Sequence, residues 1–347
     1  MDRSNQPSPY KDKAFKRSAW LFLFLICLLG VLVMVSLASG YLALTPADIW
    51  RTVTGEGTAA HELLLYQFRL PRIVLAVLVG TGMATAGAIF QGVTQNGLAD
   101  PGIIGIHSGS GFFAVLYLYL LTLNQDQPPV WVNTGLPFAA FIGGISAAVL
   151  IYVLAWKEGV TPIRLVLVGI GVNAGFSAAL LLVQLRMSES DFNRALIWLS
   201  GSIWNASWAA VLRLLPWILI FIPSALYKAR VLSVMQLGEE MAVGLGTAIE
   251  KERIKLLTIG VALSAASVSA AGGIAFVGLI APHLARRLVG GKFQRLIPVC
   301  AVIGAILIVL SDTLARTILA PTEIPVGLIV SVIGAPYFIY LLITIKE

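Results

Sequence analysis

The stretch from Leu237 to Arg287 reads LGEEMAVGLGTAIEKERIKLLTIGVALSAASVSAAGGIAFVGLIAPHLARR, and it decides how the rest of the chain is interpreted. It begins with a charged segment, continues through an apolar, small-residue run over 256–271, and closes on a break rich in Gly over 272–283. The chain has 24 basic and 17 acidic residues, and seven of these charged residues lie between Glu239 and Lys255. Because most of the remaining sequence is apolar, we expect this segment to lie outside a lipid bilayer and to meet a polar partner.

The composition excludes a soluble globular domain. Of the 347 residues, 58% are hydrophobic and only 12% are charged, whereas a soluble domain carries about 25% charge. The mean hydropathy is +0.89. A net charge of +7 is explained by basic cytoplasmic loops rather than by nucleic-acid binding. Cys27 and Cys300 lie in apolar runs, so they predict neither a metal site nor a disulfide.

Hydropathy predicts nine spans of about 20 residues, the length that crosses a bilayer. A shorter apolar piece, 276–289, lies before the last two of them. Residues 1–17 are polar and basic and precede a run too long for a signal-peptide core, so we expect them to form a cytoplasmic tail. Residues 18–347 then form a single transmembrane domain. The nine predicted spans are 18–40, 71–92, 102–123, 134–155, 164–185, 209–227, 254–275, 295–316 and 325–344.

The basic residues indicate whether the short piece crosses the membrane. With ten spans and both termini inside, 17 of the 24 basic residues, including every lysine, lie on the cytoplasmic side. If the piece did not cross, the basic cluster at 286–295 would face outward, against the positive-inside rule. We therefore predict an all-α integral membrane protein with about ten transmembrane helices. Seven basic residues remain outside, and all are arginines: Arg51, Arg69, Arg72, Arg186, Arg194, Arg213 and Arg316.

Small residues recur at four-residue spacing on several predicted spans. Such faces let helix backbones approach closely in lipid, where the hydrophobic effect gives no pairing force. We expect ordinary packing within the helix bundle, or, for some faces, a dimer seam or a pore lining. The positions are Ala76, Gly80, Ala84 and Ala88, then Gly171 and Gly175, then Ala262, Ala266 and Ala270.

Two segments on the predicted outer side are amphiphilic. Residues 45–67 read as a loop, and residues 188–208 contain Trp198, Trp204 and Trp208, which suit a short interfacial helix.

A polar break at 91–111 resembles, weakly, the break at 272–282. Gly and Pro permit non-helical backbone, which a membrane tolerates only inside protein or beside water. Breaks at corresponding places in two halves indicate an inverted repeat. The polar residues that flank the first break are candidates for lining a translocation path, or alternatively for capping helix ends: Gln91, Asn96, Ser108 and Ser110.

The sequence carries no site for an energy source. It contains no Gly-x-x-x-x-Gly-Lys-[Ser/Thr] phosphate loop, so it does not bind ATP by that route. Acidic residues are nearly absent from the span interiors; Asp312 is the exception, and its spacing to Arg316 allows a local ion pair. An ion-coupled carrier usually needs ionisable groups at the midplane. The three histidines, His61, His107 and His283, are far apart, and we predict no metal site and no cofactor.

Energy therefore has to come from a partner, and the charged segment is the natural docking surface. Glycines allow tight turns there, and carboxylates cap helices or pair with arginines. The alternative is a loop that is merely solvated. The predicted contact residues are Gly238, Glu239, Glu240, Gly244 and Gly246.

Several motifs occur in a specific order over residues 21–343. They are Arg69-Leu70-Pro71-Arg72, Gly87-x-x-Phe90-Gln91, Asn96-x-Leu98-Ala99-Asp100-Pro101-Gly102-x-x-Gly105, Gly238-Glu239-x-x-Ala242-x-x-Leu245-Gly246, Gly273-x-x-Phe276-Val277-Gly278-Leu279-x-x-Pro282-His283-x-x-Arg286 and Gly334-Ala335-Pro336.

Together these motifs resemble the FecCD-type permeases, the membrane subunits of iron–siderophore, haem and cobalamin ABC importers. The resemblance implies a ten-helix subunit with the type II ABC importer architecture, in the plasma membrane of a prokaryote. It implies a dimer with a second permease subunit (a copy or a related chain), a cytoplasmic ATPase dimer and an extracytoplasmic substrate-binding protein. The segment at about 235–252 would form the coupling helices.

The resemblance also places Arg69, Arg72 and Arg316 on the outer face, near acidic residues of the binding protein. The alternative is that these arginines reach lipid phosphates. The favoured cargo is an Fe(III)–siderophore complex, because a chelate shields the charge of the iron and a path of small, weakly polar side chains can pass it without ligating the metal. A cobalamin or haem permease is the nearest alternative. An ion-coupled secondary carrier, or a membrane enzyme or scaffold, is less favoured.

Overall fold

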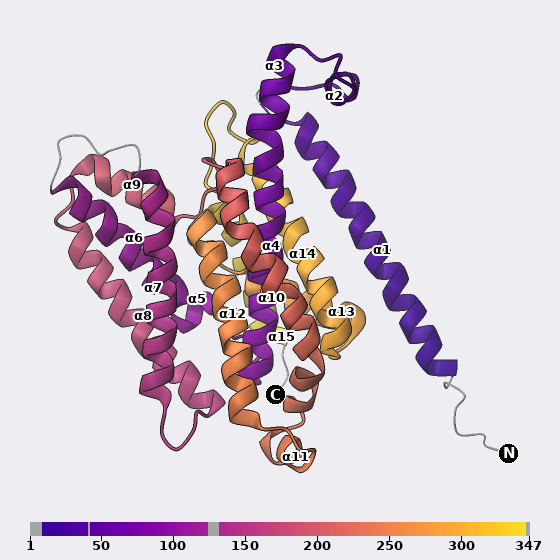
Figure 1. Ribbon diagram of the computed structural model, residues 1–347, viewed down its shortest axis with the longest axis vertical. Coiled ribbons are helices and arrows are strands. Elements are labelled where there is room, and N and C mark those ends of the chain that lie inside the picture. The colour runs from indigo at the N-terminus through magenta and orange to yellow at the C-terminus, as the bar shows by residue number, and fades with distance from the viewer. Residues whose placement is uncertain (1–8, 41, 124–131, 345–347) are drawn as a thin grey trace.

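The computed structural model describes residues 9–40, 42–123 and 132–344, and every regular element in this part of the chain is helical. Eight of the described helices are long and apolar enough to cross a membrane, as expected for a multi-pass membrane protein (Figure 1). The elements are α1 (Pro9–Ala38), α2 (Pro46–Val53), α3 (Ala59–Glu62), η1 (Leu63–Arg69), α4 (Leu70–Thr94), α5 (Pro101–Ile104), α6 (Ile106–Thr122), α7 (Val132–Ala155), α8 (Pro162–Gln184), α9 (Glu189–Leu199), α10 (Trp208–Met235), α11 (Glu239–Gly244), α12 (Ile249–Ala271), α13 (Val277–Val289), α14 (Phe293–Ala315) and α15 (Val326–Thr344).

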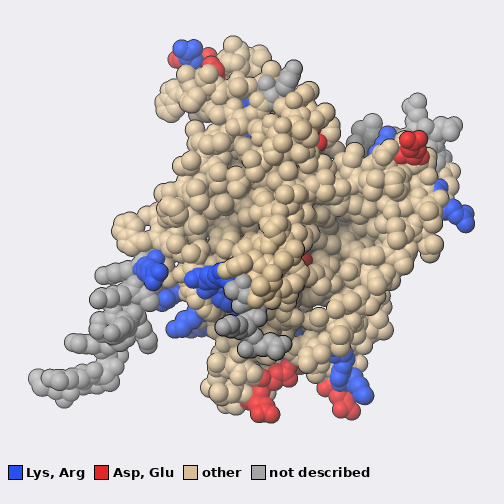
Figure 2. All heavy atoms as spheres, turned by 180° about the vertical axis from the view of Figure 1, so that it is seen from behind, with Lys and Arg blue, Asp and Glu red and all other residues tan. Residues whose placement is uncertain are grey.

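The charged residues gather toward the two ends of the molecule. Figure 2 shows an extensive uncharged belt between them. One end carries α2, α3 and α9, and the opposite end carries α11 (Figure 1). We refer to them as the α2 end and the α11 end. The predicted interfacial helix within 188–208 is present as α9, and the predicted loop at 45–67 contains α2, α3 and most of η1.

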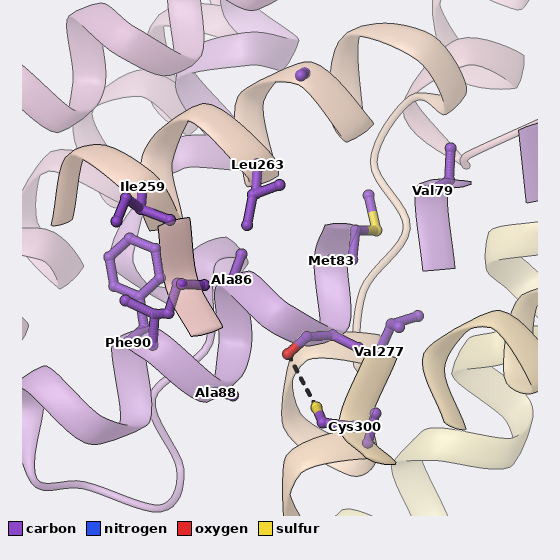
Figure 3. Close-up of a cluster of buried hydrophobic side chains, with 14 of the residues drawn as sticks. Val79, Met83, Ala86, Ala88, Phe90, Ile259, Leu263, Val277 and Cys300 are labelled. Atoms are coloured by element: carbon purple, nitrogen blue, oxygen red, sulfur yellow. Dashed lines mark hydrogen bonds between the residues drawn. The ribbon is translucent and has the colours of Figure 1, made fainter. Parts of the chain in front are cut away.

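Helix α4 is the centre of the bundle and is buried along most of its length. Its small residues allow direct backbone contact. A Cβ atom placed on Gly80 would lie 2.3 Å from the carbonyl oxygen of Gly304, and one on Gly87 would lie 1.9 Å from that of Gly278. Apolar side chains fill the remaining space around α4, and the thiol of Cys300 donates to the carbonyl of Ala84 at 3.2 Å (Figure 3). The small-residue face predicted on this span therefore packs inside the subunit.

The small residues on α8 behave differently. Gly171 and Gly175 are exposed, and no heavy atom of another segment lies within 4 Å of a Cβ placed on either. This face of α8 is not used for packing by the described part of the chain.

Two of the ten predicted spans are short helices. Helix α6 has 17 residues, and α13 has only 13, which corresponds to about 20 Å of the roughly 30 Å hydrocarbon core. The chain leaves α12 as a non-helical stretch, 272–276, with positive φ at Gly272 and Phe276. It then starts α13 against Gly87, about two turns from the α11-side end of α4. The chain between α12 and α14 therefore consists of a non-helical stretch followed by the short helix α13.

Helix α4 is also longer than the predicted span at 71–92. With α3 and η1, it forms one continuous helical segment from Ala59 to Thr94. Pro71 has no N–H to donate, and the turn before it widens into the π-helix η1, in which the N–H of Leu70 bonds to the carbonyl of Leu65. The proline thus modifies the helix without ending it.

Candidate functional site

The loop at the α11 end is a short helix between two glycines. Gly238 has φ of +97° and Gly246 has φ of +80°, values that glycine adopts at little cost because it lacks a Cβ atom. Nothing lies within 4 Å of a Cβ placed on either one. These two positions of the predicted contact set therefore shape the loop through their backbone.

Arg253 of α12 is buried and holds this loop to the rest of the subunit. Its guanidinium donates to the carboxylate of Glu239 and to the carbonyl of Val160, and Nη1 donates to Oε2 of Glu250 at 3.0 Å. The hydroxyl of Tyr152 donates to the other oxygen of Glu250 at 2.6 Å. A buried guanidinium needs such partners. Glu239 is thus engaged within the subunit, although 45% of its side chain is exposed.

The outward surface of the same loop is apolar. Ala242 is buried against the subunit, while Glu240 and Gly244 are exposed. A protruding group of large apolar side chains in water generally marks a docking surface. The exposed apolar residues are Leu237, Met241, Val243 and Leu245, each between 55% and 64% exposed.

At the α2 end, Arg69 and Arg316 bind the end of α1. Arg69 donates to the carbonyls of Leu37 and Leu42. Arg316 donates from Nη1 to the carbonyl of Ser39 at 3.0 Å. The last carbonyls of a helix have no partner within the helix, so these two arginines satisfy part of the C-terminal end of α1.

Arg72 and Arg316 share one buried carboxylate. Nη2 of Arg72 lies 2.8 Å from Oδ1 of Asp312, and Nε of Arg316 lies 3.5 Å from Oδ2. Glu323 adds a second carboxylate, 2.9 Å from Nη1 of Arg72. The predicted Asp312–Arg316 pair is present, and the contact with Arg72 joins α14 to α4. Arg69 adds a third positive charge at this end, and its own hydrogen bonds are to backbone carbonyls.

The three arginines predicted to dock a partner are therefore engaged with groups of their own subunit. Arg69 and Arg316 are buried, and the side chain of Arg72 is 11% exposed. Helix α2, at the same end, is more exposed than these arginines, and its Trp50 is 70% exposed. The docking role of the arginines stays a prediction. A docked partner would meet arginines that already pair with Asp312 and Glu323.

Helix α2 is held by a capping box. The hydroxyl of Thr45 accepts a bond from the N–H of Asp48, and the Asp48 carboxylate accepts from the N–H and the hydroxyl of Thr45. The hydroxyl bond, followed by the backbone bond, lowers the pKa of the Asp48 carboxyl.

The polar residues of the first break bond to nearby backbone. Asn96 is exposed, and its Oδ1 accepts from the N–H of Leu98 at 2.9 Å. The hydroxyl of Ser108 donates to the carbonyl of Gly105 at 2.9 Å. Both contacts are local, and neither side chain accepts a hydrogen bond from an N–H group at a helix start. Whether these two residues line a path or only stabilise the break stays a prediction.

Gln91 and Ser110 are buried. Nε2 of Gln91 lies 3.4 Å from the carbonyl oxygen of Gly278, and the hydroxyl of Ser110 has no partner among the described residues. Their predicted place on a path also stays a prediction.

The start of α13 brings several motifs together. Gly278 lies against Gly87, and a Cβ placed on Gly278 would be 2.6 Å from Oδ2 of Asp100. A Cβ placed on Gly334 of α15 would be 2.6 Å from the side chain of Phe276. Residues from four separated motifs therefore meet where the two breaks touch. The glycines are needed there for close approach.

Among the described residues, no three His, Cys, Asp or Glu side chains lie close enough together to hold a metal ion.

Comparison with known proteins identifies the family. The model of the FecCD transport family matches residues 28–344. The chain belongs to the FecCD transport family. It is 56% identical to the iron(3+)-hydroxamate import system permease protein FhuG of Bacillus subtilis (strain 168), over 91% of this chain and 94% of that protein. It is 36% identical to the hemin transport system permease protein HmuU of Yersinia pestis, over 93% and 95%.

The FecCD fold is also found among solved structures. A metal-chelate type ABC transporter in an inward-facing conformation superposes with a TM-score of 0.83 at 29% identity, covering 94% of this chain and all of that one. The similarity extends along nearly the whole chain, which supports the predicted permease architecture of a FecCD protein.

Three features of this FecCD chain were not found from the sequence. They are the anchoring role of Arg253, the pairing of Glu323 with Arg72, and the outward apolar side chains of the α11 loop. Met241, Val243 and Leu245 occur within an otherwise charged segment, and this was the available signal for the third. The contacts of Arg253 with Glu239 and Val160, and the contact of Arg72 with Glu323, join residues distant in the chain, for which the spacing of residues gives no signal.

Proposed function

We propose that this chain is the membrane-spanning permease subunit of an ATP-driven importer of Fe(III)–siderophore complexes. The observation that carries the proposal is the 56% identity, over 91% of the chain, to a permease of iron(3+)-hydroxamate import. This identity extends over the whole permease domain and is not limited to a local motif. The chain contributes the path, and ATP hydrolysis belongs to a separate subunit.

In this proposal the α11 loop is the contact with the ATPase dimer. Its apolar residues and Glu240 project outward, while Arg253 holds the loop through Glu239. Gly238, Gly244 and Gly246 would set the shape of the contact. Replacing both Glu239 and Glu240 with lysine is expected to uncouple ATP hydrolysis from uptake while the protein still inserts. Uptake at the parent rate by that double variant would contradict the proposed role.

The proposal assigns the α2 end to the extracytoplasmic binding protein. Arg69, Arg72 and Arg316 would supply the positive charge there, because Asp312 and Glu323 pair with Arg72 and Arg316 while Arg69 bonds to backbone carbonyls. Charge pairs at a rim mainly set association rate and orientation. The α11 end and both termini would then be cytoplasmic, in agreement with the positive-inside rule.

The exposed small-residue face of α8 is the proposed seam with a second permease subunit, either a copy or a related chain. Gly171 and Gly175 lie there without close neighbours, and such faces pair well in lipid. Gln91, Asn96, Ser108 and Ser110 are proposed to border the path that the two subunits enclose.

The test is uptake of labelled iron by cells in which this chain is deleted and then restored. We expect Fe(III)–hydroxamate uptake to be lost on deletion, to return with the chain, and to depend on the ATPase that co-purifies with it. Labelled haem and cobalamin serve as competing cargoes. Restored haem uptake without hydroxamate uptake would replace the proposed cargo, and the 36% identity to a hemin permease makes haem the second candidate.

A further inference from the structure

A cleft on the side of the bundle lies between α7, α10 and α12, and Tyr152, which bonds to Glu250, lines it. Its volume is about 410 Å³, within the roughly 300–1,000 Å³ typical of ligand pockets. The walls are almost entirely apolar, with Phe141 and Ala148 on α7, Trp217 and Phe221 on α10, and Leu257 and Val261 on α12. The cleft therefore suits a hydrocarbon chain.

The rim of this cleft faces hydrocarbon. Ile145, Val149 and Val153 on α7 line it and are between 37% and 62% exposed. Apolar side chains with this exposure, in the uncharged belt of a membrane protein, contact lipid.

A second hollow continues the cleft toward the α11 end. The two share Ile254 and Thr258 as a common wall, and the second hollow is lined by Lys228 and Lys255 as well as by Tyr227. Lys228 and Lys255 lie directly at the predicted span limits, 209–227 and 254–275. Their ammonium groups therefore belong at the level of the lipid headgroups.

The charge of this hollow favours an anion. Lys228 lies 2.6 Å and Lys255 2.9 Å from the carboxylate of Glu252, so two cations share one negative charge. Each ammonium has three N–H donors, and Glu252 takes one from each. The remaining donors point to a phosphate, because basic pockets between transmembrane helices on the cytoplasmic side bind anionic headgroups.

We propose that this cleft binds one anionic phospholipid of the inner leaflet, with an acyl chain between α7, α10 and α12 and its phosphate on Lys228 and Lys255. The leaflet follows from the orientation given under the proposed function, whereas the cleft and its lysines do not depend on the cargo. The site would favour lipids with a net negative headgroup over zwitterionic lipids with the same chains.

The experiment is native mass spectrometry of the full-length chain, purified with the subunits that stay bound, delipidated and titrated with phosphatidylglycerol or phosphatidylcholine of identical chains. We expect one tightly held phosphatidylglycerol per chain and weaker binding of phosphatidylcholine. In the double variant Lys228→Gln/Lys255→Gln, the preference for phosphatidylglycerol over phosphatidylcholine should fall by about fivefold for each lysine removed. The matched control, Lys157→Gln/Lys292→Gln, removes two exposed lysines outside the cleft and should bind like the parent.

The apolar part is tested by Ala148→Phe, which fills the cleft from α7, with Leu150→Phe on the same helix outside the cleft as its control. Ala148→Phe should lose the tight lipid and Leu150→Phe should keep it. Since Lys255 is exposed, Lys255→Gln alone tests the headgroup if the larger change prevents folding. Equal binding of the two lipids by the parent, or parent-like binding by the lysine variants, would overturn the proposal.

A second copy of the chain in the cleft would also overturn it. That outcome would be seen as a disulfide-linked dimer of Val149→Cys, in a Cys27→Ser background, in membranes. Loss of iron uptake in any cargo assay would bear on the proposed function and would leave the lipid stoichiometry unaffected.

Discussion

Both ends of the molecule contain buried arginines, but the two ends use them in opposite ways. At the α2 end, Arg316 and Asp312 are buried, with Asp312 1% exposed, and Arg72 is 11% exposed. At the α11 end, Arg253 is buried while its carboxylate partners, Glu239 and Glu250, are 45% and 32% exposed. The first network fastens helices to each other. The second fastens a protruding loop and leaves its apolar surface outward.

The largest effect on stability is expected at the α2 end. Asp312→Asn removes a carboxylate shared by two arginines and leaves buried positive charge, a loss of about 3–5 kcal/mol. Thermal unfolding in detergent measures it. Glu323→Gln is the matched control, because that pair is partly hydrated and contributes at most about 1 kcal/mol. If the two variants unfolded at the same temperature, the two carboxylates of the network would be equivalent.

Removing the arginine of the α11 end should affect transport more than stability. Arg253→Met frees the loop and leaves one buried carbonyl unpaired, which costs about 1–3 kcal/mol. The loss of stability is no larger because the carboxylates that Arg253 binds can bind water instead. Uptake by the inserted protein should be lost. Arg230→Met, an exposed arginine of α10, should keep uptake. A variant of Arg253 that transports normally would show that the loop needs no anchor.

The exposed apolar surface of the α11 loop should matter for transport and hardly for folding. Met241→Asp/Leu245→Asp changes side chains that are more than 60% exposed, so stability should stay within about 0.5 kcal/mol. ATPase co-purification should fall and uptake should stop. Val53→Asp, equally exposed on α2 at the other end, should retain the ATPase. Equal retention by both variants would contradict the proposed contact.

The smallest effect is expected from Glu323→Gln in a docking assay. This change frees Arg72 for a carboxylate of the binding protein, and a partly exposed pair of this kind contributes about 0.2–1 kcal/mol. Affinity at low salt should rise by up to about fivefold. Thr322→Ala, beside it and without charge, is the control. Unchanged affinity would indicate that Arg72 serves only the internal network.

The sequence predicted the membrane architecture well because hydropathy and charge are local properties. Eight long helices coincide with predicted spans, and α9 lies inside the predicted interfacial segment. The family followed from motifs with fixed spacing, and the match over 28–344 confirms it. Charge alone predicts that the short piece at 276–289 crosses the membrane, and this stays a prediction. Its conformation, the 13-residue helix α13, could not be predicted.

The tertiary structure decided which chemical groups meet. The spacing of four residues predicted the contact between Asp312 and Arg316. Arg72 and Asp312 are far apart in the chain and no periodicity links them, so their ion pair could not be predicted. The same holds for the contacts of Arg253 with Glu239 and Val160, which lie in other segments of the chain. The small residues of α4 and of α8 look alike in the sequence, yet only those of α4 are buried.

What the sequence determined by itself was which segments form the long apolar helices, since the cost of placing charge and unpaired backbone in lipid acts on each segment separately. What only the tertiary structure decided was whether a given glycine or arginine faces inward or outward. Gly87 is required because α13 begins against it, and Arg316 is buried because α1 ends beside it. Both facts depend on packing between distant segments, which the local pattern around each residue does not contain.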